Sequence, residues 1–213
     1  KTMITINNIF DLKNVNITEN IIYWTGYYEI NDGGGGVFIW DSSNNDTEDL
    51  GIIIASNLSS LGRWRRLINN SLINVNWFGA IPNCNKYTNW DDDLGSNIIN
   101  STVAIQNAIT FCEENGFTLL FPTGRNIYAN YYYQYFVSDT LKIRKTISIL
   151  GQTGTSIVAD IHNKPIFEIS NCFRGKIENL IICGYKYRPL AGIKFIPPDN
   201  QALELINIKI YTC

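Results

Sequence analysis

Two sequence patterns recur at nearly the same interval in the last third of the chain. PIFEIS is followed by the similar GIKFIP, and IENLIIC is followed by LINIKIY. The step from Ile166 to Ile193 nearly equals the step from Asn179 to Asn207. A repeat of this length, made of short apolar strands without a helix, indicates a solenoid in which each winding buries its apolar face against the next.

Such a repeat can wind as a parallel β-helix, with coils stacked at the interstrand spacing of about 4.8 Å. We expect its inward side chains to form one continuous apolar column. Asparagine is suited to turns, so Asn179 and Asn207 are expected to stack at one corner and to bond the backbone of the next coil. The predicted column pairs Ile166, Ile169, Leu180 and Ile182 with Ile193, Ile196, Ile208 and Ile210.

One helix is predicted upstream, over about residues 102–115. Ser101 or Thr102 is its expected N-cap, and Gly116 follows its last residue. An open solenoid end exposes strand edges and core, so we expect the apolar stripe of this helix to close it. The stripe, at helical spacing, consists of Ile105, Ala108, Ile109 and Cys112.

Four consecutive glycines, Gly33–Gly36, stand in the segment GYYEINDGGGGVFIWDSS. Asn31 and Asp32 precede them, and an alternating strand follows, so we predict a hairpin or a strand pair with a bulged corner. A phosphate-binding loop is the alternative. It is disfavoured because no Lys-Ser or Lys-Thr follows and the next element is predicted as a strand, not as a helix N-terminus.

These patterns predict an all-β protein with little helix, divided into three parts. Residues 1–72 form a small N-terminal β domain, residues 73–125 a connector that contains the capping helix, and residues 126–213 the first coils of a truncated β-helix, about three in number. Within the connector, VNWFGA is predicted as a short apolar strand. Both termini are expected to be cut, because Lys1 is not an initiator methionine and the chain ends inside a strand pattern.

Composition excludes several classes of function. The 213-residue chain has 17% charged residues and a net charge of −2, which gives no electrostatic footprint for nucleic acid. Its apolar runs are far shorter than the roughly 20 residues of a membrane span, so no membrane insertion is expected. Five unevenly spaced cysteines and a single His162 argue against a disulfide framework and a zinc site, and favour buried free thiols. The cysteines are Cys84, Cys112, Cys172, Cys183 and Cys213.

Two further motifs have a functional and a structural interpretation. Arg65 and Arg66 beside Trp64 could contact a glycan or nucleic acid, but without a wider basic patch we favour the edge of a half-buried strand. The run Asp91–Asp93 could bind calcium, but it lacks the spacing of a calcium loop, so a solvated loop or helix start is favoured. No metal or cofactor is predicted.

The ordered series of motifs resembles a known family. GYYEINDGGGGVFIWDSS, GRWRRL, VNWFGA, NSTVAIQNAI, LLFPTG, YFVSDTLKI and ISILGQTGTSIV are similar, in this order, to the N-terminal part of bacteriophage tailspike and tail-fibre proteins with a pectate-lyase-like right-handed parallel β-helix. The resemblance extends from about Tyr23 to Val158. It implies a homotrimer of the virion, attached to other tail or baseplate proteins and assembled in the host cytoplasm, whose β-helix binds and in many members cleaves host surface polysaccharide.

The chain departs from this family in two segments. The loop after WFGA is longer than the usual Gly-Asp-Gly segment, and a tyrosine-rich insertion precedes VSDTLKI. Tyr131, Tyr132 and Tyr133 in this insertion could stack on sugar rings or pack between subunits, and the second interpretation is slightly favoured.

Catalysis would require a particular constellation of residues. Glycoside hydrolysis needs two facing carboxylates, and lyase chemistry needs a base and a cation. Glu168 and Glu178 lie near the same coil and could meet, but outward, solvated carboxylates are favoured, and any catalytic residues are expected beyond Cys213. The catalytic residues are therefore unknown. The candidates considered are Asp139, Asp160, Glu168, Glu178 and Glu204.

Three hypotheses follow. The first is a receptor-binding tailspike that degrades polysaccharide in its full-length form. The second is a non-catalytic fibre or structural tail adaptor, and the third is a secreted bacterial polysaccharide lyase or hydrolase. The glycine-rich N-terminal domain favours the first two, because a free enzyme has no need of a virion-side module.

Overall fold

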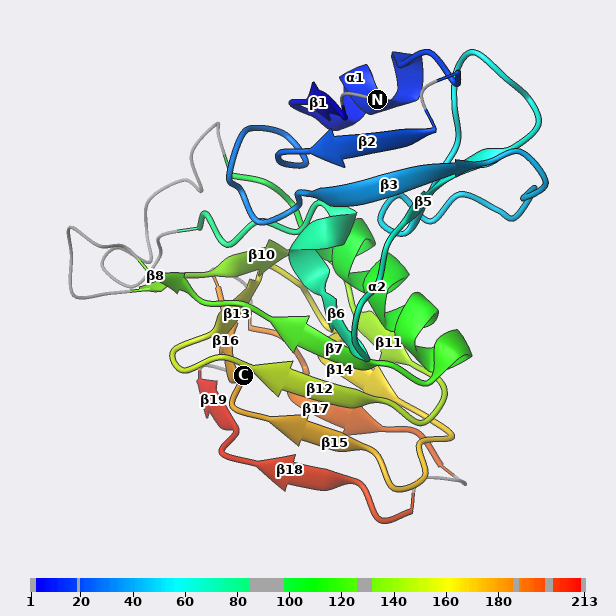
Figure 1. Cartoon of the computed structure of the whole chain (residues 1–213). Coiled ribbons are helices and arrows are strands. Elements are labelled where there is room, and N and C mark those ends of the chain that lie inside the picture. Colours follow the sequence, from blue (N-terminus) through cyan, green and yellow to red (C-terminus); the bar gives the residue numbers. More distant parts are fainter. Residues whose placement is uncertain are drawn as a thin grey trace.

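The structure of the chain, a computed structural model, describes residues 3–18, 20–84, 98–125, 132–185, 188–197 and 201–211. An N-terminal β domain lies at one end of a stack of parallel strands, and the longest helix of the described chain covers that end (Figure 1). The all-β fold with a cap helix and stacked parallel coils is confirmed.

The N-terminal domain is a five-stranded sheet in the order β1-β2-β3-β5-β4. Strands β2, β3, β5 and β4 pair antiparallel, and β1 adds to one edge in parallel. The predicted strand pair around the glycines is confirmed, with Trp24 opposite Gly36. The strands are β1 (Ile4–Ile6), β2 (Ile21–Trp24), β3 (Gly36–Asp41), β4 (Ile53–Ile54) and β5 (Arg63–Arg66).

A short helix, α1 (Ile9–Asn14), is not predicted by the sequence pattern. Asn8 caps it by accepting a hydrogen bond from the backbone N–H of Asp11 at 3.0 Å. Its buried Leu12 joins the apolar core of this domain. The helix has fewer than two turns, which is too short for an apolar periodicity to stand out in the sequence.

Three parallel sheets form the solenoid, and each coil contributes one strand to each sheet in turn (Figure 1). The first sheet contains β6 (Leu72–Asn74), β7 (Thr118–Phe121), β12 (Ser148–Gly151), β15 (Lys176–Glu178) and β18 (Glu204–Ile206). The second contains β10 (Tyr135–Val137), β13 (Ser156–Ala159), β16 (Ile181–Gly184) and β19 (Lys209–Tyr211). The third contains β11 (Leu141–Ile143), β14 (Pro165–Ile169) and β17 (Ala191–Phe195).

The register confirms the stacking of the coils and corrects two predicted pairs, since Ile169 lies opposite Phe195 and not Ile196. In the first sheet Ile149 lies opposite Ile177, which lies opposite Leu205, at the same interval as the paired asparagines. In the third sheet, however, Ile193 pairs with Phe167 and not with Ile166. The coil contains slightly fewer residues here than separate Ile166 from Ile193 in the chain. The prediction aligned these two isoleucines, so its register differs from the observed one by a single position.

Asn179 and Asn207 stack at the corner between the first and second sheets, as predicted. Both have left-handed backbones, with φ of 59° and 51°, a conformation that asparagine tolerates better than most residues. The bonding differs from the prediction: the Asn207 side-chain amide donates to the Asn179 side-chain oxygen at 2.8 Å, and not to backbone.

The cap helix α2 (Thr102–Asn115) confirms the predicted span, and its whole apolar stripe is buried against the solenoid. Gly116 ends it in the left-handed conformation. Ser101 occupies the predicted N-cap position, but its side chain makes no capping bond, and Asn100 accepts the backbone N–H of Thr102 at 3.1 Å instead.

The cap helix also satisfies the free edge of the third sheet. The Gln106 amide donates to the Lys142 carbonyl at 2.9 Å and accepts its N–H at 2.8 Å, so one side chain replaces a missing neighbouring strand. Glu113 accepts the backbone N–H groups of Arg144 and Lys145. Edge groups of a sheet need partners or water, and here α2 supplies the partners.

Within the predicted connector, residues 73–125, β7 and the end of β6 already pair in register with solenoid strands. VNWF is not a strand: it forms the 3-10 helix η1 (Val75–Phe78), ended by Gly79 at φ 91°. The remaining strands, β8 (Gly124–Arg125) and β9 (Tyr132–Tyr133), form a small antiparallel pair beside the solenoid.

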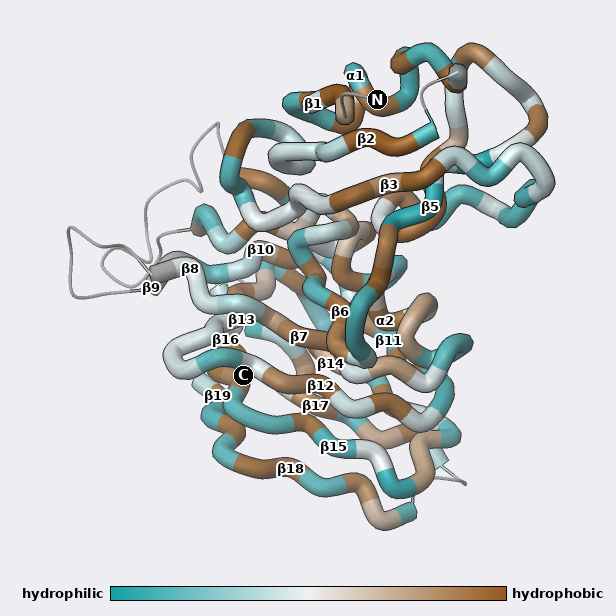
Figure 2. The backbone as a smooth tube through the Cα atoms, viewed as in Figure 1, coloured by the Kyte–Doolittle hydropathy of each residue, from teal (hydrophilic) through white to brown (hydrophobic). Residues whose placement is uncertain are grey.

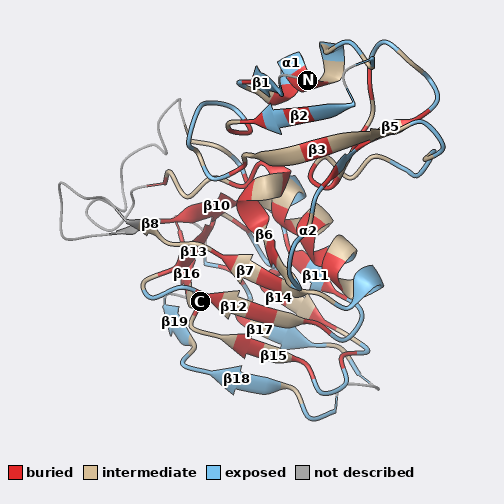
Figure 3. Cartoon of the chain, viewed as in Figure 1, coloured by how far each residue is buried: buried red, intermediate tan, exposed pale blue. Residues whose placement is uncertain are grey.

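Apolar residues follow the strands through the solenoid interior (Figure 2). Burial is nearly complete in the middle coils and falls in β18 and β19 (Figure 3). Ile182 is fully buried, whereas its partner Ile210 in β19 is 46% exposed. The described coils therefore present an apolar face at the end opposite the cap.

Candidate functional site at the domain junction

The glycine corner is joined to the rest of the molecule through Arg66. This side chain is only 5% exposed and donates hydrogen bonds to the carbonyl oxygens of Gly34 at 2.7 Å, Gly35 at 2.5 Å and Gly51 at 2.9 Å. The sequence interpretation of Arg66 as a strand-edge residue is therefore wrong. The sequence does contain a signal for the burial of Arg66. It lies two residues after the buried Trp64 in strand β5, and period-two alternation puts both side chains on the buried face.

Aromatic rings enclose the same guanidinium. Its carbon lies 4.6 Å from the ring centre of Phe38 and 4.8 Å from that of Trp77, distances at which a cation is attracted to a ring face. Burial lowers the pKa of Arg66 to about 9, so the group stays protonated at neutral pH. Because Trp77 belongs to η1, the cation connects the N-terminal sheet to the segment that leads into the solenoid.

Close backbone packing explains the run of glycines. A side-chain carbon on Gly34 would lie 2.5 Å from Cβ of Tyr27, and one on Gly35 would lie 2.7 Å from the Trp24 carbonyl oxygen. Gly33 has a φ of 90°, which disfavours other residues. The structural interpretation of the run is confirmed: the corner is a packed connection whose carbonyls face Arg66.

Asp32 fixes this corner from the opposite side. One of its carboxylate oxygens accepts the N–H groups of Tyr27 and Gly34 at 2.9 and 2.8 Å, and the other accepts those of Tyr28 and Glu29 at 2.7 and 3.2 Å. Four backbone donors are thus satisfied by one side chain.

A polar chain continues from the corner into the solenoid. The Asn76 amide donates to the Asp32 carbonyl at 3.3 Å, and its oxygen lies 2.8 Å from the Tyr135 hydroxyl. That hydroxyl is also 2.9 Å from the Pro122 carbonyl oxygen. Tyr135 is fully buried, and burial raises the pKa of its hydroxyl. Because Tyr135 lies in β10, the N-terminal domain and the solenoid share one buried hydrogen-bond network.

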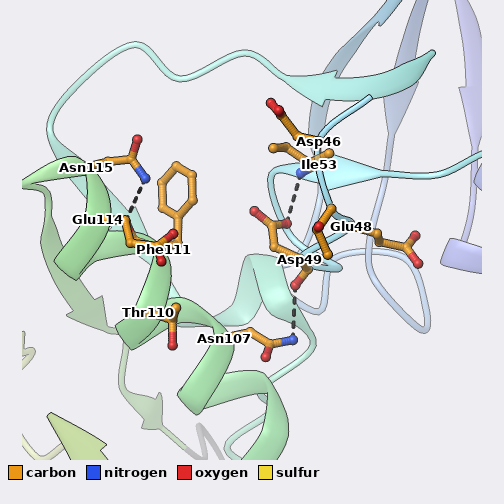
Figure 4. Close-up of a pocket in the computed structure, with 10 residues that line it drawn as sticks. Asp46, Glu48, Asp49, Ile53, Asn107, Thr110, Phe111, Glu114 and Asn115 are labelled. Atoms are coloured by element: carbon orange, nitrogen blue, oxygen red, sulfur yellow. Dashed lines mark hydrogen bonds between the residues drawn. The ribbon is translucent and has the colours of Figure 1, made fainter. Parts of the chain in front are cut away.

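A cleft of about 600 Å³ opens at this junction, between the N-terminal domain and the cap helix (Figure 4). One wall is the loop before β4 together with Ile53, and the other wall is the outer side of α2. Figure 4 shows Phe111 and Ile53 on opposite walls. The lining residues are Asp46, Thr47, Glu48, Asp49, Ile53, Asn107, Thr110, Phe111, Glu114 and Asn115.

The walls of the cleft are held in place by bonds of their own. One oxygen of Asp49 accepts the N–H groups of Gly51, Ile52 and Ile53 at 2.7 to 2.9 Å, and the Asn107 amide crosses to the Asp49 carbonyl at 3.1 Å (Figure 4). Burial raises the pKa of the Asp49 carboxyl, although these donors oppose the shift.

Glu48 and Phe111 are fixed as well. Glu48 forms an ion pair with Lys13 at 2.8 Å and accepts the Ala55 N–H at 3.0 Å. Phe111 stacks on Phe117 with ring centres 5.8 Å apart. The cleft is therefore preorganised. Sequence reasoning did not find it, because its two walls meet through Asp49 and Asn107, which are 58 positions apart in the chain.

The proposed catalytic candidates are distributed over the solenoid. Asp139 pairs with Lys164 at 2.9 Å, and this hydrogen bond lowers the pKa of the Asp139 carboxyl. Glu168 lies in register between Lys142 and Lys194 on the third sheet.

The other candidates lie on different sheets. Glu178, on the first sheet, pairs with Lys176 at 2.6 Å, and Glu204 lies opposite the same lysine. Glu168 and Glu178 thus belong to different sheets, and each has a lysine neighbour. Asp160 has one buried carboxylate oxygen without a hydrogen-bond partner.

The remaining candidates are placed as follows. Arg65 is half exposed and pairs with Asp41 at 3.1 Å. Asp91–Asp93, Tyr131 and Cys213 lie outside the described residues, and of Tyr132 and Tyr133 only the backbone is described. The other four cysteines are buried thiols that form no disulfide.

The part of the chain that the structure describes contains neither a metal-binding cluster nor a membrane-spanning helix. No group of three or more His, Cys, Asp or Glu side chains there could hold a metal ion. No helix there is long and apolar enough to cross a membrane.

Comparison with protein families identifies the N-terminal domain. Residues 5–70 match the family model of the phage tail protein small four-stranded beta-sheet domain. The four antiparallel strands β2, β3, β5 and β4 lie within this range, and β1 extends the sheet at its edge.

Solved structures share the whole architecture. Pantoea stewartii WceF, a glycan biofilm modifying enzyme with a bacteriophage tailspike-like parallel β-helix fold, matches with a TM-score of 0.71 and 20% identity over 98% of this chain and 30% of its own. The Acinetobacter phage vB_ApiP_P1 tailspike matches with a TM-score of 0.66 and 15% identity, over 99% of this chain and 38% of its own. Tailspike gp49 of Acinetobacter baumannii bacteriophage Fri1 is a capsular polysaccharide depolymerase. It matches with a TM-score of 0.62 and 13% identity, over 96% of this chain and 42% of its own.

The chain therefore spans less than half the length of these structures, and the likeness at this level of identity concerns the fold. Both of its parts, the tail-protein domain and the coils stacked behind the cap helix, recur there in one chain. The chain therefore joins a segment that matches the phage tail small β-sheet domain to a parallel β-helix, and its fold is similar to that of solved phage tailspikes.

Proposed function

We propose that the whole protein is a receptor-binding spike of a phage tail. The N-terminal domain attaches it to the virion, and the β-helix recognises a surface polysaccharide of the host. The match of residues 5–70 to a phage tail domain supports the first part, and the fold shared with the Fri1 depolymerase supports the second.

The buried junction is the observation that best supports this proposal. Arg66, Asn76 and Tyr135 connect the two parts through buried hydrogen bonds. A tail spike must hold its receptor-binding part in a fixed direction relative to the tail, and such a network provides that fixation, whereas a flexible linker would not.

We further propose that the spike is a homotrimer of the virion, assembled in the host cytoplasm and attached to other tail or baseplate proteins. The outer face of the N-terminal sheet supports this proposal, because it is an apolar surface that another protein subunit could cover. Its apolar side chains remain exposed in the single chain, with Ile21 at 47%, Tyr23 at 42% and Leu67 at 47%. The proposed division places this module at residues 1–72, before the connector and the coils.

Degradation of the polysaccharide, by hydrolysis or by elimination, is proposed for the whole protein without assigning catalytic residues in this chain. The test is to incubate the full-length protein with purified surface polysaccharide of the host. Release of oligosaccharides is expected. Binding without product would identify a non-catalytic receptor-binding fibre, and absence of both binding and product would contradict the proposal.

WceF supports a second candidate, because it is a glycan-modifying enzyme with the same architecture. A secreted bacterial polysaccharide lyase or hydrolase would not be part of a virion. Mass spectrometry of purified phage particles distinguishes the two: peptides of this chain are expected among the tail proteins, and their absence from particles would favour the bacterial enzyme.

A further inference from the structure

We propose that the junction cleft is a binding site for an uncharged saccharide. The cleft, lined as described above by the loop before β4 and by α2, has a volume of about 600 Å³. This is within the roughly 300–1,000 Å³ of typical ligand sites. The inference does not depend on the proposed function, because it concerns residues of this chain alone.

Hydrogen-bond acceptors dominate the lining. The carboxylates of Asp46 and Glu114 can only accept when ionised. Thr110 already donates to a backbone carbonyl at 3.0 Å, which leaves its oxygen as an acceptor, and Asn107 and Asn115 each donate one N–H, at 3.1 and 2.8 Å, which leaves an oxygen and a second N–H on each amide. A matching ligand must therefore supply several donors, as hydroxyl groups do.

The carboxylates of the cleft disfavour anionic ligands, although the Arg63 guanidinium donates to the backbone carbonyl of Asp46 at 2.9 Å. Lys13 neutralises Glu48, and three backbone N–H groups face Asp49, but the carboxylates of Asp46 and Glu114 have no cationic partner among the described residues. A uronate or another acidic sugar would be repelled by these two groups.

The apolar part of the lining suits the face of a sugar ring. Phe111 stands in the cleft with one side stacked on Phe117, at 9° between the ring planes, and Ile53 lies on the opposite wall (Figure 4). Aromatic side chains combine a large apolar surface with a fixed geometry, which allows the C–H face of a pyranose to pack between the two walls.

The spacing of the polar groups favours an extended ligand over a single ammonium group. Asn107 lies in the middle of α2 and Asn115 is its last residue, about 12 Å apart along the helix axis. An ammonium group needs only a few acceptors around one point, whereas acceptors spread over this length match a ligand with hydroxyl groups along two or three rings.

The test is the binding of defined trisaccharides to the 213-residue chain. Titration calorimetry measures the affinity, and NMR measures the chemical-shift changes of the Asn107 and Asn115 side-chain amides. Maltotriose and N,N′,N″-triacetylchitotriose are the uncharged probes, trigalacturonate is the acidic probe and spermidine is the amine probe. We expect at least one uncharged probe to bind and to shift both amides, and the acidic probe to bind at least tenfold more weakly.

Variants locate the binding in the cleft. Phe111→Ala is expected to weaken binding at least tenfold, and Phe10→Ala, which removes a 73% exposed ring on α1, serves as the matched control. Because Phe111→Ala could disturb packing, the exposed Glu114→Lys provides a second test: it is expected to weaken the uncharged probe and to improve binding of trigalacturonate.

Three results would overturn the inference: no binding of either uncharged probe, binding of spermidine alone, or binding unaffected by both cleft variants. Each leaves the proposed attachment to the tail untouched, since that proposal is tested on virions and on the host polysaccharide.

Discussion

Single side chains at the glycine corner replace the regular pairing of a sheet. Asp32 accepts four backbone N–H groups and Arg66 donates to three backbone carbonyls, so two opposite charges organise one irregular segment from its two sides. Backbone groups that leave a sheet must find other partners, and long irregular corners are stable only where side chains supply them.

Replacing Asp32 by alanine should therefore destabilise the chain strongly. Removing the carboxylate leaves partly buried N–H donors unpaired, and each unpaired donor costs about 1–3 kcal/mol of stability. We therefore expect the free energy of unfolding, measured by urea denaturation, to fall by at least about 2–4 kcal/mol. Asp32→Asn retains one acceptor oxygen and is expected to lose about half as much. Equal stability of Asp32→Ala and the unchanged chain would contradict this role.

Asp49 offers a prediction that depends on pH. Burial raises the pKa of its carboxyl in the folded state, so ionisation disfavours folding as the pH rises from below the ordinary aspartate pKa to neutrality. In Asp49→Asn the amide oxygen could still accept the three N–H groups without a buried charge. We expect the unfolding free energy of this variant, relative to the unchanged chain, to increase over that pH range.

Asp49→Ala is the matched comparison, because it removes both the charge and the acceptor. It should be less stable than the unchanged chain at every pH, by about 2 kcal/mol or more at neutral pH. If Asp49→Asn is as destabilised as Asp49→Ala at neutral pH, the charge itself and not the acceptor holds the loop.

At the scale of elements, the sequence was most informative where the apolar pattern was regular. The cap helix and the recurrence of the coils were predicted, because Ile105, Ala108 and the paired asparagines repeat at fixed spacing. α1 and η1 were missed, since each spans only a few residues and is set by a local asparagine cap. The junction and the cleft could not be predicted, because they unite residues such as Asn76 and Tyr135 that are 59 positions apart.

The cap helix is expected to protect the sheet edge that it covers. Gln106→Ala removes both bonds to Lys142, each worth about 0.5–1.5 kcal/mol, so amide exchange at Lys142 should accelerate about tenfold or more. Val103→Ala, at a 66% exposed position of the same helix, is the control and should leave this exchange unchanged. Unchanged exchange in Gln106→Ala would show that water protects the edge equally well.

At the scale of the whole molecule, the two parts are expected to unfold together. Tyr135→Phe removes the hydroxyl that lies between Asn76 and Pro122, so the buried oxygen to which its single proton is donated loses its partner, at a cost of about 1–3 kcal/mol in unfolding free energy. Tryptophan fluorescence reports the N-terminal domain and the junction, and far-ultraviolet circular dichroism reports mainly the solenoid strands.

In the unchanged chain the two unfolding curves should coincide, and in Tyr135→Phe the fluorescence transition should move to lower urea. Tyr23→Phe, with an exposed ring in β2, is the control and should leave both curves in place. Separate transitions already in the unchanged chain would contradict a shared network.

We propose that the N-terminal domain fastens a polysaccharide-binding β-helix to a phage tail in a fixed direction. Cryo-electron microscopy of phage particles that contain the full-length protein tests it most directly. We expect density for residues 5–70 against the tail, with the coils stacked behind the cap helix pointing away from the particle. Particles without this density, or with the coils against the tail and the N-terminal domain outermost, would contradict it.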